Sequence, residues 1–255
     1  MQPTVSIILP TYNQAQYLSA AFDGILAQTY RDFELIVVND GSTDETSRIV
    51  SEYRGRKPFR LIETENRGLP SALNRGFREA SGSYLTWTSS DNIMLPRMLE
   101  SLVQALDNDP EIGLAYADWY LIDQDGQILS TARSRKFDRL LLLRDDYINA
   151  CFLYRRECQA RVGEYNTTLS GSEDWDYWLR IAKHFRMKHV PEVLYKFRVH
   201  SQSMTANREG LVPYREFAAK WRRDNPMAWY ASKVKWHLLG LVLGRRPSVR
   251  FEPSG

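Results

Sequence analysis

Carboxylate side chains stand at three places in this sequence where they could do chemistry. Asp40 and Asp91 each follow a strand-like apolar run, and Glu173 and Asp174 open a helix-like segment. A carboxylate in a cleft can take a proton from an attacking hydroxyl group, and its oxygen atoms are ligands that Mg²⁺ and Mn²⁺ favour. His200, in "RVHSQSMT", is the one histidine of four that lies among small polar residues after a strand. These residues are therefore the candidates for an active site.

Each candidate also has a purely structural explanation. The stretch "NDGSTD" around Asp40 is a good turn into a helix. Asp91, in "SSDN", could cap the helix that we expect after it. Ser172 could cap a later helix, whose first turn would hold Asp174 and favour its negative charge. Taken one at a time, these residues do not distinguish an active site from ordinary turns and helix caps.

The first hundred residues alternate between strand and helix patterns, and this alternation positions the candidates. Short apolar runs predict strands at 5–12, 33–40, 59–65 and 83–90. Helical spacing predicts helices between and after them, at 17–26, 42–53, 69–80 and 94–106. Ser42 and Glu45 form a capping box for the second helix, and Pro70 suits the first turn of the third. Repeated units of this kind predict an α/β fold, with a parallel sheet flanked by helices.

All four expected strands end in polar residues: "PTYN", "NDGSTD", "ENRG" and "SSDN". The carboxyl ends of parallel strands meet at one edge of a sheet, and ligands bind there. The sequence contains neither the Gly-rich dinucleotide motif nor the P-loop motif. A nucleotide at this edge would need other contacts: Asp40 and Tyr12 could bind its base, and Arg67 with a metal ion at Asp91 could bind its diphosphate.

The pattern changes after Gly113, and we divide the chain into three parts: residues 1–112, residues 113–207 as a smaller second half of the same domain, and residues 208–255 as a helical extension. The second part should contain two strands around an Asp-Gly turn within 113–129 and a strand at 150–155. A helix at 173–185 and a strand from residue 193 should follow.

The composition excludes several classes of protein. The 34 Lys and Arg residues nearly balance the 31 Asp and Glu residues, so bulk charge does not favour a nucleic-acid partner. Cys151 and Cys158 lack metal-ligand spacing and are expected to be buried, reduced thiols. No secretory leader precedes the first strand, and the longest apolar stretch, at 237–244, is too short to span a membrane. We therefore expect a soluble, cytoplasmic protein.

The ordered set "PTYN", "NDGSTD", "ENRG", "SSDN" and "SEDWDYWLR", followed by His200, resembles family 2 of the glycosyltransferases, which have the GT-A fold. The resemblance covers about residues 4–205. It implies an inverting, metal-dependent transferase that moves a sugar from a nucleoside-diphosphate donor, with a UDP-sugar as the first expectation, to an acceptor hydroxyl group. Residues 1–112 would bind the nucleotide sugar and residues 113–207 the acceptor, a glycan or a lipid-linked molecule, in polysaccharide or glycoconjugate assembly.

The resemblance also implies a role for each candidate. Asp40 would accept an N–H group of uracil or its equivalent, and Arg67 would lie near the base and phosphates. Asp91 and His200 would hold Mn²⁺ or Mg²⁺, and Asp174 would be the catalytic base. The full set implied to contact the donor nucleotide is Pro10, Thr11, Tyr12, Asn13, Asp40, Arg67, Ser90 and Asp91.

Ser89 and Ser90 depart from the family pattern, because relatives usually carry at least one further aspartate at this point. A serine hydroxyl can bond a ribose hydroxyl group, but it is a weak, neutral metal ligand. We expect the metal site to persist with modest affinity and to fill mainly when the donor is present.

Two rival functions fit parts of the pattern. A nucleotidyltransferase should show a Gly-rich, basic loop after the first strand, and "PTYNQAQY" has neither glycine nor Lys or Arg. A non-catalytic nucleotide-sugar-binding module would explain the missing aspartates, but the retained Asp174 argues against it.

The C-terminal segment from about residue 227 combines tryptophans, an apolar run and clustered Lys and Arg residues. This composition suits an interfacial helix at the inner face of the cell membrane, near a lipid-linked acceptor. The alternative is a helix that packs on the body of the protein or on another subunit of a homo-oligomer. Both alternatives stay open on the sequence alone.

Overall fold

The computed structural model describes residues 3–56, 58–169 and 171–203, the single positions 219, 221, 223, 224 and 226, and the backbone of 250–253. The helical extension predicted at 208–255 lies almost entirely outside these residues. Among the described helices, none combines the length and the apolar character that crossing a bilayer requires.

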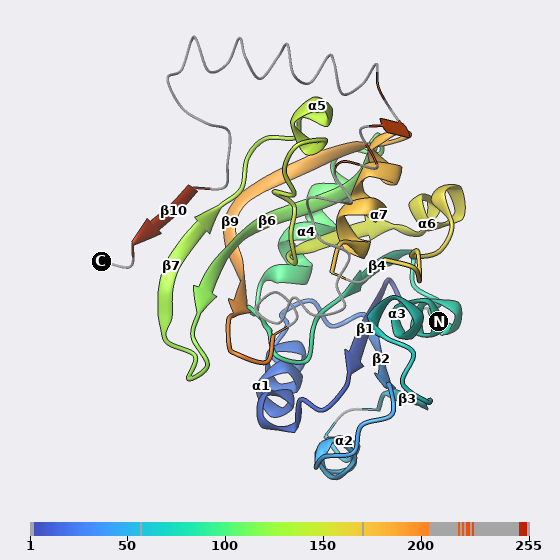
Figure 1. The fold of residues 1–255 in the computed structure, drawn as a ribbon, viewed down its shortest axis with the longest axis vertical. Coiled ribbons are helices and arrows are strands. Elements are labelled where there is room, and N and C mark those ends of the chain that lie inside the picture. The colour runs from blue at the N-terminus through green and yellow to red at the C-terminus, as the bar shows by residue number, and fades with distance from the viewer. Residues whose placement is uncertain are drawn as a thin grey trace.

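Four parallel strands form the first part of the sheet: β1 (Val5–Thr11), β2 (Phe33–Asn39), β3 (Arg60–Glu63) and β4 (Tyr84–Trp87). They lie in the order β3-β2-β1-β4 (Figure 1). The helices that connect them are α1 (Ala15–Leu26), α2 (Thr46–Tyr53) and α3 (Leu69–Glu79). The predicted parallel sheet with connecting helices is confirmed for this part of the chain.

The second part of the sheet is mixed rather than parallel. β6 (Ile112–Ile122) pairs antiparallel with β7 (Ile128–Arg133) and β8 (Phe152–Arg155), and β8 pairs antiparallel with β4. β9 (Arg186–Arg198) runs parallel to β6 and also pairs with the short β5 (Ile93–Met94), while β10 (Arg250–Pro253) pairs with β7. Figure 1 shows these long, curled strands beside the parallel part. The helices of this region are α4 (Met98–Asp107), α5 (Arg139–Leu142), α6 (Arg156–Val162) and α7 (Glu173–Ala182).

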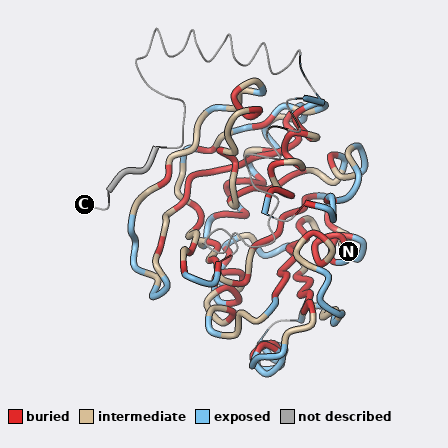
Figure 2. The backbone as a smooth tube through the Cα atoms, in the orientation of Figure 1, coloured by how far each residue is buried: buried red, intermediate tan, exposed pale blue. Residues whose placement is uncertain are grey.

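Hydrophobic clusters cover both faces of the sheet, because successive side chains of a strand point to opposite faces. Ile7 and Leu9 of β1 pack in a cluster with α1, α2 and α4, while Ile8 packs in the other cluster with α3, α5, α6 and α7. Each of these three side chains is fully buried, which stabilises the fold by about 1.5–3 kcal/mol per side chain. Figure 2 shows the same burial along the central strands. The strand ends, and the loops after them, are therefore held on a rigid frame.

Two of the predicted helix starts are wrong. α2 begins at Thr46 because Ser42 does not cap it; the Ser42 hydroxyl oxygen instead accepts the main-chain N–H of Asn13 at 3.1 Å. α4 begins at Met98 because Ile93–Met94 pairs with β9 as a strand. Pro70 does lie in the first turn of α3, as predicted. Both cysteines are buried and free, which confirms that prediction.

Candidate active site

A cavity of about 500 Å³ opens at the carboxyl ends of the parallel strands. The loops after β1, β2, β3 and β4 contribute to its lining, as the sequence predicted. Residues around Asn149, Asp174 and Arg198 line it from the second part of the chain. The predicted site residues that the cavity brings together are Pro10, Thr11, Tyr12, Asn13, Asp40, Ser90, Asp91 and Asp174.

Hydrogen bonds join the loops after β1 and β2. The main-chain N–H of Asn13 donates to the Ser42 hydroxyl group, and the Asn13 side-chain oxygen accepts the N–H of Thr43 at 2.8 Å. Asn13 adopts a positive φ of 50°, a conformation that asparagine tolerates better than most residues. Tyr12, the residue before it, is 45% exposed and borders the cavity. This geometry leaves an aromatic face available beside a rigid loop.

Asp40, only 3% exposed, ties the end of β2 to the loop after β3. Its carboxylate accepts the main-chain N–H of Gly68 at 2.9 Å and that of Arg67 at 3.2 Å. Burial raises the pKa of Asp40 above its ordinary value, although these hydrogen bonds oppose the shift. Asp40 thus has a structural role in addition to the base contact that the resemblance implies, and its oxygen atoms can accept further bonds.

The Arg67 side chain does not line the main cavity. It is 71% exposed, lies 3.7 Å from Glu65, and lines a neighbouring cavity of about 420 Å³. Asp40 borders both cavities, so the main chain of Arg67 is close to the predicted base site while its guanidinium group lies on the outer side. Of the predicted donor residues, Arg67 is the one whose side chain the structure separates from the others.

Asp91 and His200 lie together although 109 positions separate them in the chain. The Nε2 atom of His200 is 3.2 Å from Oδ2 of Asp91, and their side chains are 2% and 13% exposed, respectively. The ring of Tyr17 packs against the imidazole, with centroids 4.7 Å apart. Asp91 is no helix cap, because α4 begins only at Met98. The predicted pairing of this aspartate with this histidine is therefore present in the fold.

The chemistry of this pair fits a divalent cation. Oδ1 of Asp91 is buried and has no hydrogen-bond partner among the described residues, which leaves a carboxylate oxygen ready to coordinate. An oxygen ligand and an imidazole nitrogen together suit Mn²⁺, and Mg²⁺ less well. The described residues contain no cluster of three or more His, Cys, Asp or Glu side chains of metal-binding geometry. A metal ion at Asp91 and His200 would therefore need other ligands, such as the phosphate groups of a substrate.

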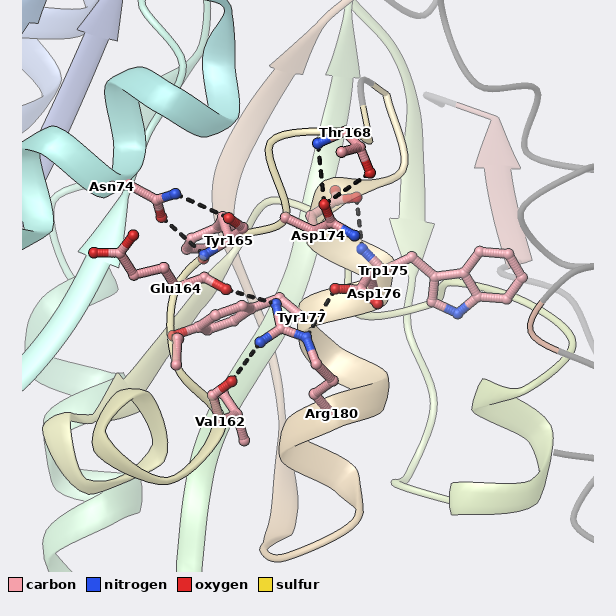
Figure 3. Close-up of polar contacts among 12 residues, drawn as sticks. Asn74, Val162, Glu164, Tyr165, Thr168, Asp174, Trp175, Asp176, Tyr177 and Arg180 are labelled. Carbon is pink, nitrogen blue, oxygen red and sulfur yellow. Dashed lines mark hydrogen bonds and ion pairs between the residues drawn. The ribbon is translucent and has the colours of Figure 1, made fainter. Parts of the chain in front are cut away.

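The first turn of α7 brings two carboxyl groups, Glu173 and Asp174, to the cavity. Ser172 occupies the N-cap position, but its side chain makes no capping hydrogen bond, so the predicted serine cap is wrong. Glu173 instead accepts the main-chain N–H of Gly171 at 2.5 Å, and Asp174 accepts that of Trp175 at 2.7 Å. Figure 3 shows Asp174 at the start of the helix, beside the loop that precedes it.

Burial perturbs the carboxyl groups on this side of the cavity. It raises the pKa of Glu173 to about 8, with the neighbouring Asp174 as the second cause. The pKa of Asp174 is also raised by burial, against the hydrogen bond from Trp175. Burial and the charge of Asp174 raise the pKa of Asp146 well above its usual range. A charge on Asp174 thus opposes ionisation of both Glu173 and Asp146.

The loop before α7 is fixed by side chains from two helices (Figure 3). Asn74 of α3 donates to the carbonyl of Tyr165 at 2.9 Å and accepts its N–H at 2.8 Å. Arg180 of α7 donates to the carbonyl groups of Val162 and Glu164 at 2.6 and 3.0 Å. These bonds satisfy main-chain groups of the loop and hold the start of α7 in place.

Some cavity residues carried no signal in the sequence. Asn149, which has a positive φ of 54°, and Ala150 reach the cavity from the segment before β8. The charge of Asp174 raises the pKa of Asp146, which lies in the same segment. Arg198 could have been noticed, because it closely precedes His200 in "RVHS". The segment around residue 149 could not, because only the fold brings it to the strand ends.

Comparison with known proteins identifies the family. The chain matches the model of "Glycosyl transferase family 2" over residues 6–162. An uncharacterized glycosyltransferase of Rickettsia prowazekii is 35% identical over 212 residues, which are 80% of this chain and 66% of that protein. The chondroitin synthase of Escherichia coli is 28% identical over 207 residues, 79% of this chain and 30% of that protein. The chain thus spans less than two thirds of the length of both relatives.

Solved structures confirm the predicted GT-A fold. S. aureus TarS in complex with UDP superimposes with a TM-score of 0.64 at 20% identity, covering 79% of this chain and 61% of that chain. A mannosyltransferase from Pyrobaculum calidifontis, in complex with GDP-Man and Mn²⁺, gives 0.63 at 24% identity, covering 97% and 77%. Together with the match over residues 6–162, the agreement between motifs and fold shows that this chain belongs to glycosyl transferase family 2.

Proposed function

We propose that this chain transfers a sugar, with inversion at the anomeric carbon, from a nucleoside-diphosphate donor to an acceptor hydroxyl group. Residues 1–112 would bind the donor and residues 113–207 the acceptor. The observation that carries the proposal is the composition of one cavity: the loops at the strand ends and the buried carboxyl of Asp174 line the same space. The proposed nucleotide site and the proposed general base would therefore be adjacent.

The donor nucleotide would lie along the loops after the parallel strands. Tyr12 supplies an aromatic face for the base, and Asp40 supplies a buried carboxylate that can accept a base N–H. Ser90, which is 2% exposed at the cavity wall, would bond a ribose hydroxyl group. Arg67 would act through the main-chain bond to Asp40, or reach the donor from the neighbouring cavity.

Asp174 would act as the general base. Its carboxylate would take the proton of the acceptor hydroxyl while that oxygen forms a bond to the anomeric carbon. The bond from the anomeric carbon to the phosphate oxygen would break on the opposite face, and the nucleoside diphosphate would leave. The raised pKa of Asp174 supports this role, because it makes the carboxylate a stronger proton acceptor.

Asp91 and His200 would hold a divalent metal ion, with Mn²⁺ preferred because one ligand is an imidazole. Bound there, the ion would offset the negative charge that develops on the leaving diphosphate. The Mn²⁺ in the structure of the Pyrobaculum mannosyltransferase supports a divalent ion in this fold.

A UDP-sugar is the first expectation for the donor. The solved relatives support nucleotide sugars as a class, since TarS was solved with UDP and with UDP-GlcNAc, and the mannosyltransferase with GDP-Man. The likeness to a chondroitin synthase supports a glycan acceptor in polysaccharide assembly. We propose that the enzyme works in the cytoplasm or at the inner face of the cell membrane.

A thermal-shift screen of UDP-, GDP- and dTDP-sugars, each with Mn²⁺ or with EDTA, tests the proposal. One nucleotide class should raise the melting temperature, and Mn²⁺ should increase that shift. Asp91→Ala should remove the effect of Mn²⁺, whereas Glu111→Ala, which removes an exposed carboxylate outside the cavity, should leave it unchanged.

Hydrolysis of the same donor, followed by release of nucleoside diphosphate, then separates an enzyme from a binding module. A protein that binds the donor but never turns it over, with or without glycan acceptors, contradicts the catalytic proposal. Activity that resists EDTA and tolerates Asp91→Ala contradicts the metal assignment.

A further inference from the structure

Arg198, the last residue of β9, is a buried cation beside the cavity. It is 5% exposed and lines the cavity wall. In the part of the chain that the structure describes, no carboxylate lies within ion-pair distance of its guanidinium group. Burying an arginine is costly unless its N–H groups are satisfied, so its partners indicate what it does.

Main-chain carbonyl groups of two loops satisfy this guanidinium group. Its Nε atom donates to the carbonyl of Asp91 at 2.8 Å, and Nη1 donates to the carbonyls of Asp123 and Gln124 at 3.0 and 2.8 Å. The main-chain N–H of Arg198 also donates to the side-chain oxygen of Asn92 at 2.8 Å. Arg198 therefore joins the β4–β5 loop, which carries Asp91, to the turn between β6 and β7.

The turn between β6 and β7 is itself preformed to accept these bonds. The carboxylate of Asp123 accepts the main-chain N–H groups of Asp125 and Gln127, and Gly126 adopts a φ of +86°. These features of the turn fix the positions of the Asp123 and Gln124 carbonyl groups. The planar guanidinium group can reach both loops at once, which a lysine ammonium group with a single nitrogen cannot do in the same geometry.

Tyr17 of α1 connects Arg198 to His200. The guanidinium carbon lies 4.7 Å from the centroid of the Tyr17 ring, and the imidazole ring of His200 lies 4.7 Å from the same centroid. One aromatic ring thus contacts both the arginine that holds the Asp91 main chain and the histidine that faces the Asp91 carboxylate. Stacking on a ring is favourable for a cation and restricts how the side chain can move.

We infer that Arg198, acting with Tyr17, is a positioning residue that sets the placement of Asp91 and His200 for binding a metal–nucleotide complex. This inference rests on the proposed function, because it takes Asp91 and His200 as the protein ligands of the metal. Neither Arg198 nor Tyr17 needs to touch the ion: one holds the main chain of the first ligand, and the other packs on the second.

Titration of Mn²⁺, followed by the loss of the free-ion EPR signal in the presence of UDP, tests this inference directly. Arg198→Lys should weaken Mn²⁺ binding by about 10–100-fold, the range found when residues that orient metal ligands are changed. Tyr17→Leu should weaken it in the same direction, and Tyr17→Phe, which keeps the ring, should bind as the unmodified protein does.

Arg56→Ala is the matched control, because Arg56 stacks on Tyr53 at 4.3 Å on the exposed side of α2. It should leave Mn²⁺ binding unchanged. UDP affinity measured in EDTA should be the same for all variants, since the expected effect concerns the metal ligands. An equal loss of UDP affinity in EDTA would show general damage to the site and would overturn the inference.

The remaining outcomes separate the inference from the proposed function. If the unmodified protein takes up no Mn²⁺ with UDP, the proposed metal site fails and the inference fails with it. If the unmodified protein binds Mn²⁺ and Arg198→Lys binds it equally well, the inference fails while the proposed function stands. Should Arg198→Lys not fold, as judged by circular dichroism, the difference between Tyr17→Leu and Tyr17→Phe decides.

Discussion

The two sides of the cavity use carboxylates in different ways. On the donor side, which we define as the loops after β1, β2 and β3, Asp40 and Asp44 each accept at least one main-chain N–H group from a segment distant in the sequence. Asp40 holds Arg67 and Gly68, and Asp44 holds Ala15 and Thr46. Although burial alone would raise the pKa of Asp44, its hydrogen bonds lower it below the ordinary value. The hydrogen bonds to both carboxylates keep the loops in place, although burial raises the pKa of Asp40.

On the base side, which we define as Asp146, Glu173 and Asp174, the carboxyl groups are buried near one another. Each has a raised pKa, and burial is the largest cause for all three. Glu173 accepts the main-chain N–H of Gly171, Asp174 that of Trp175, and Asp146 those of Ile148 and Asn149, all within three positions in the sequence. The donor-side carboxylates thus tie together segments that are distant in the sequence, whereas on the base side the charge of Asp174, the proposed general base, raises the pKa of both Glu173 and Asp146.

Asp174→Asn should give the largest effect. The amide cannot take a proton, so we expect transfer to fall by about 10²–10⁴-fold in kcat while donor affinity stays nearly unchanged. Kinetics with saturating donor, together with calorimetric titration of the nucleotide, measure the two quantities. Glu157→Gln, in the first turn of α6 and exposed, is the control. Near-normal turnover in Asp174→Asn would contradict the assignment of Asp174 as the general base.

Asp40→Asn should affect binding instead of turnover. The asparagine oxygen can take the place of Oδ2, which accepts the main-chain N–H groups of both Arg67 and Gly68. Its NH₂ group would then replace the other carboxylate oxygen and face the N–H group of the nucleotide base, and leaving a buried donor unpaired costs about 1–3 kcal/mol. We expect the dissociation constant for the nucleotide to rise about 10-fold or more. Asp44→Asn should lower the melting temperature without this loss of affinity, because Asp44 lies outside the cavity lining. Equal nucleotide affinities for both variants would contradict the assignment of Asp40.

Glu173→Gln should change how stability depends on pH. The pKa of Glu173 is raised in the folded state, so the unfolded chain releases this proton first as the pH rises, and the folded protein loses stability until about pH 8. As the pH rises from the ordinary pKa of glutamate to pH 8, the free energy of unfolding of the variant should increase relative to that of the unmodified protein, by up to about 1.4 kcal/mol per pH unit. Above pH 8 the difference should stay constant. Urea unfolding from pH 5 to 9 measures the difference, and parallel curves would contradict it.

Gly41→Ala should give the smallest effect, confined to the donor side. Gly41 has a φ of +77°, and a Cβ atom there would lie 2.8 Å from the main-chain nitrogen of Asn66. We expect a loss of about 1–2 kcal/mol in the free energy of unfolding, since a non-glycine residue is strained at this φ. Gly55→Ala, whose Cβ would meet nothing within 4 Å, should be neutral. A neutral Gly41→Ala would show that the donor-side loops are not tightly packed.

Local patterns predicted the donor side well. The strand-like runs before "PTYN", "NDGSTD" and "ENRG" become β1, β2 and β3 with their polar loops, because strand formation and turn chemistry depend on neighbouring residues. The predicted cap at Ser42 and the predicted helix start at 94 are wrong for one reason. Contacts with distant residues, Asn13 and β9 respectively, replaced the local alternatives.

By itself, the sequence determined the β-α repeat, the polar strand ends, the carboxylates and histidine of the candidate site, and the family they resemble. These features are local, since each depends on a short run of residue types and on the rule that parallel strand ends share an edge.

Only the tertiary structure decided which of these groups meet. It placed His200 at Asp91, set the Arg67 guanidinium apart, and brought Asp146 near Asp174. It also brought Arg198 to the main chain of Asp91, and Tyr17 to both Arg198 and His200. These outcomes depend on the pairing of β9 with β5 and β6 and on burial, which raises the pKa of a carboxyl group only where chain segments distant in sequence exclude water.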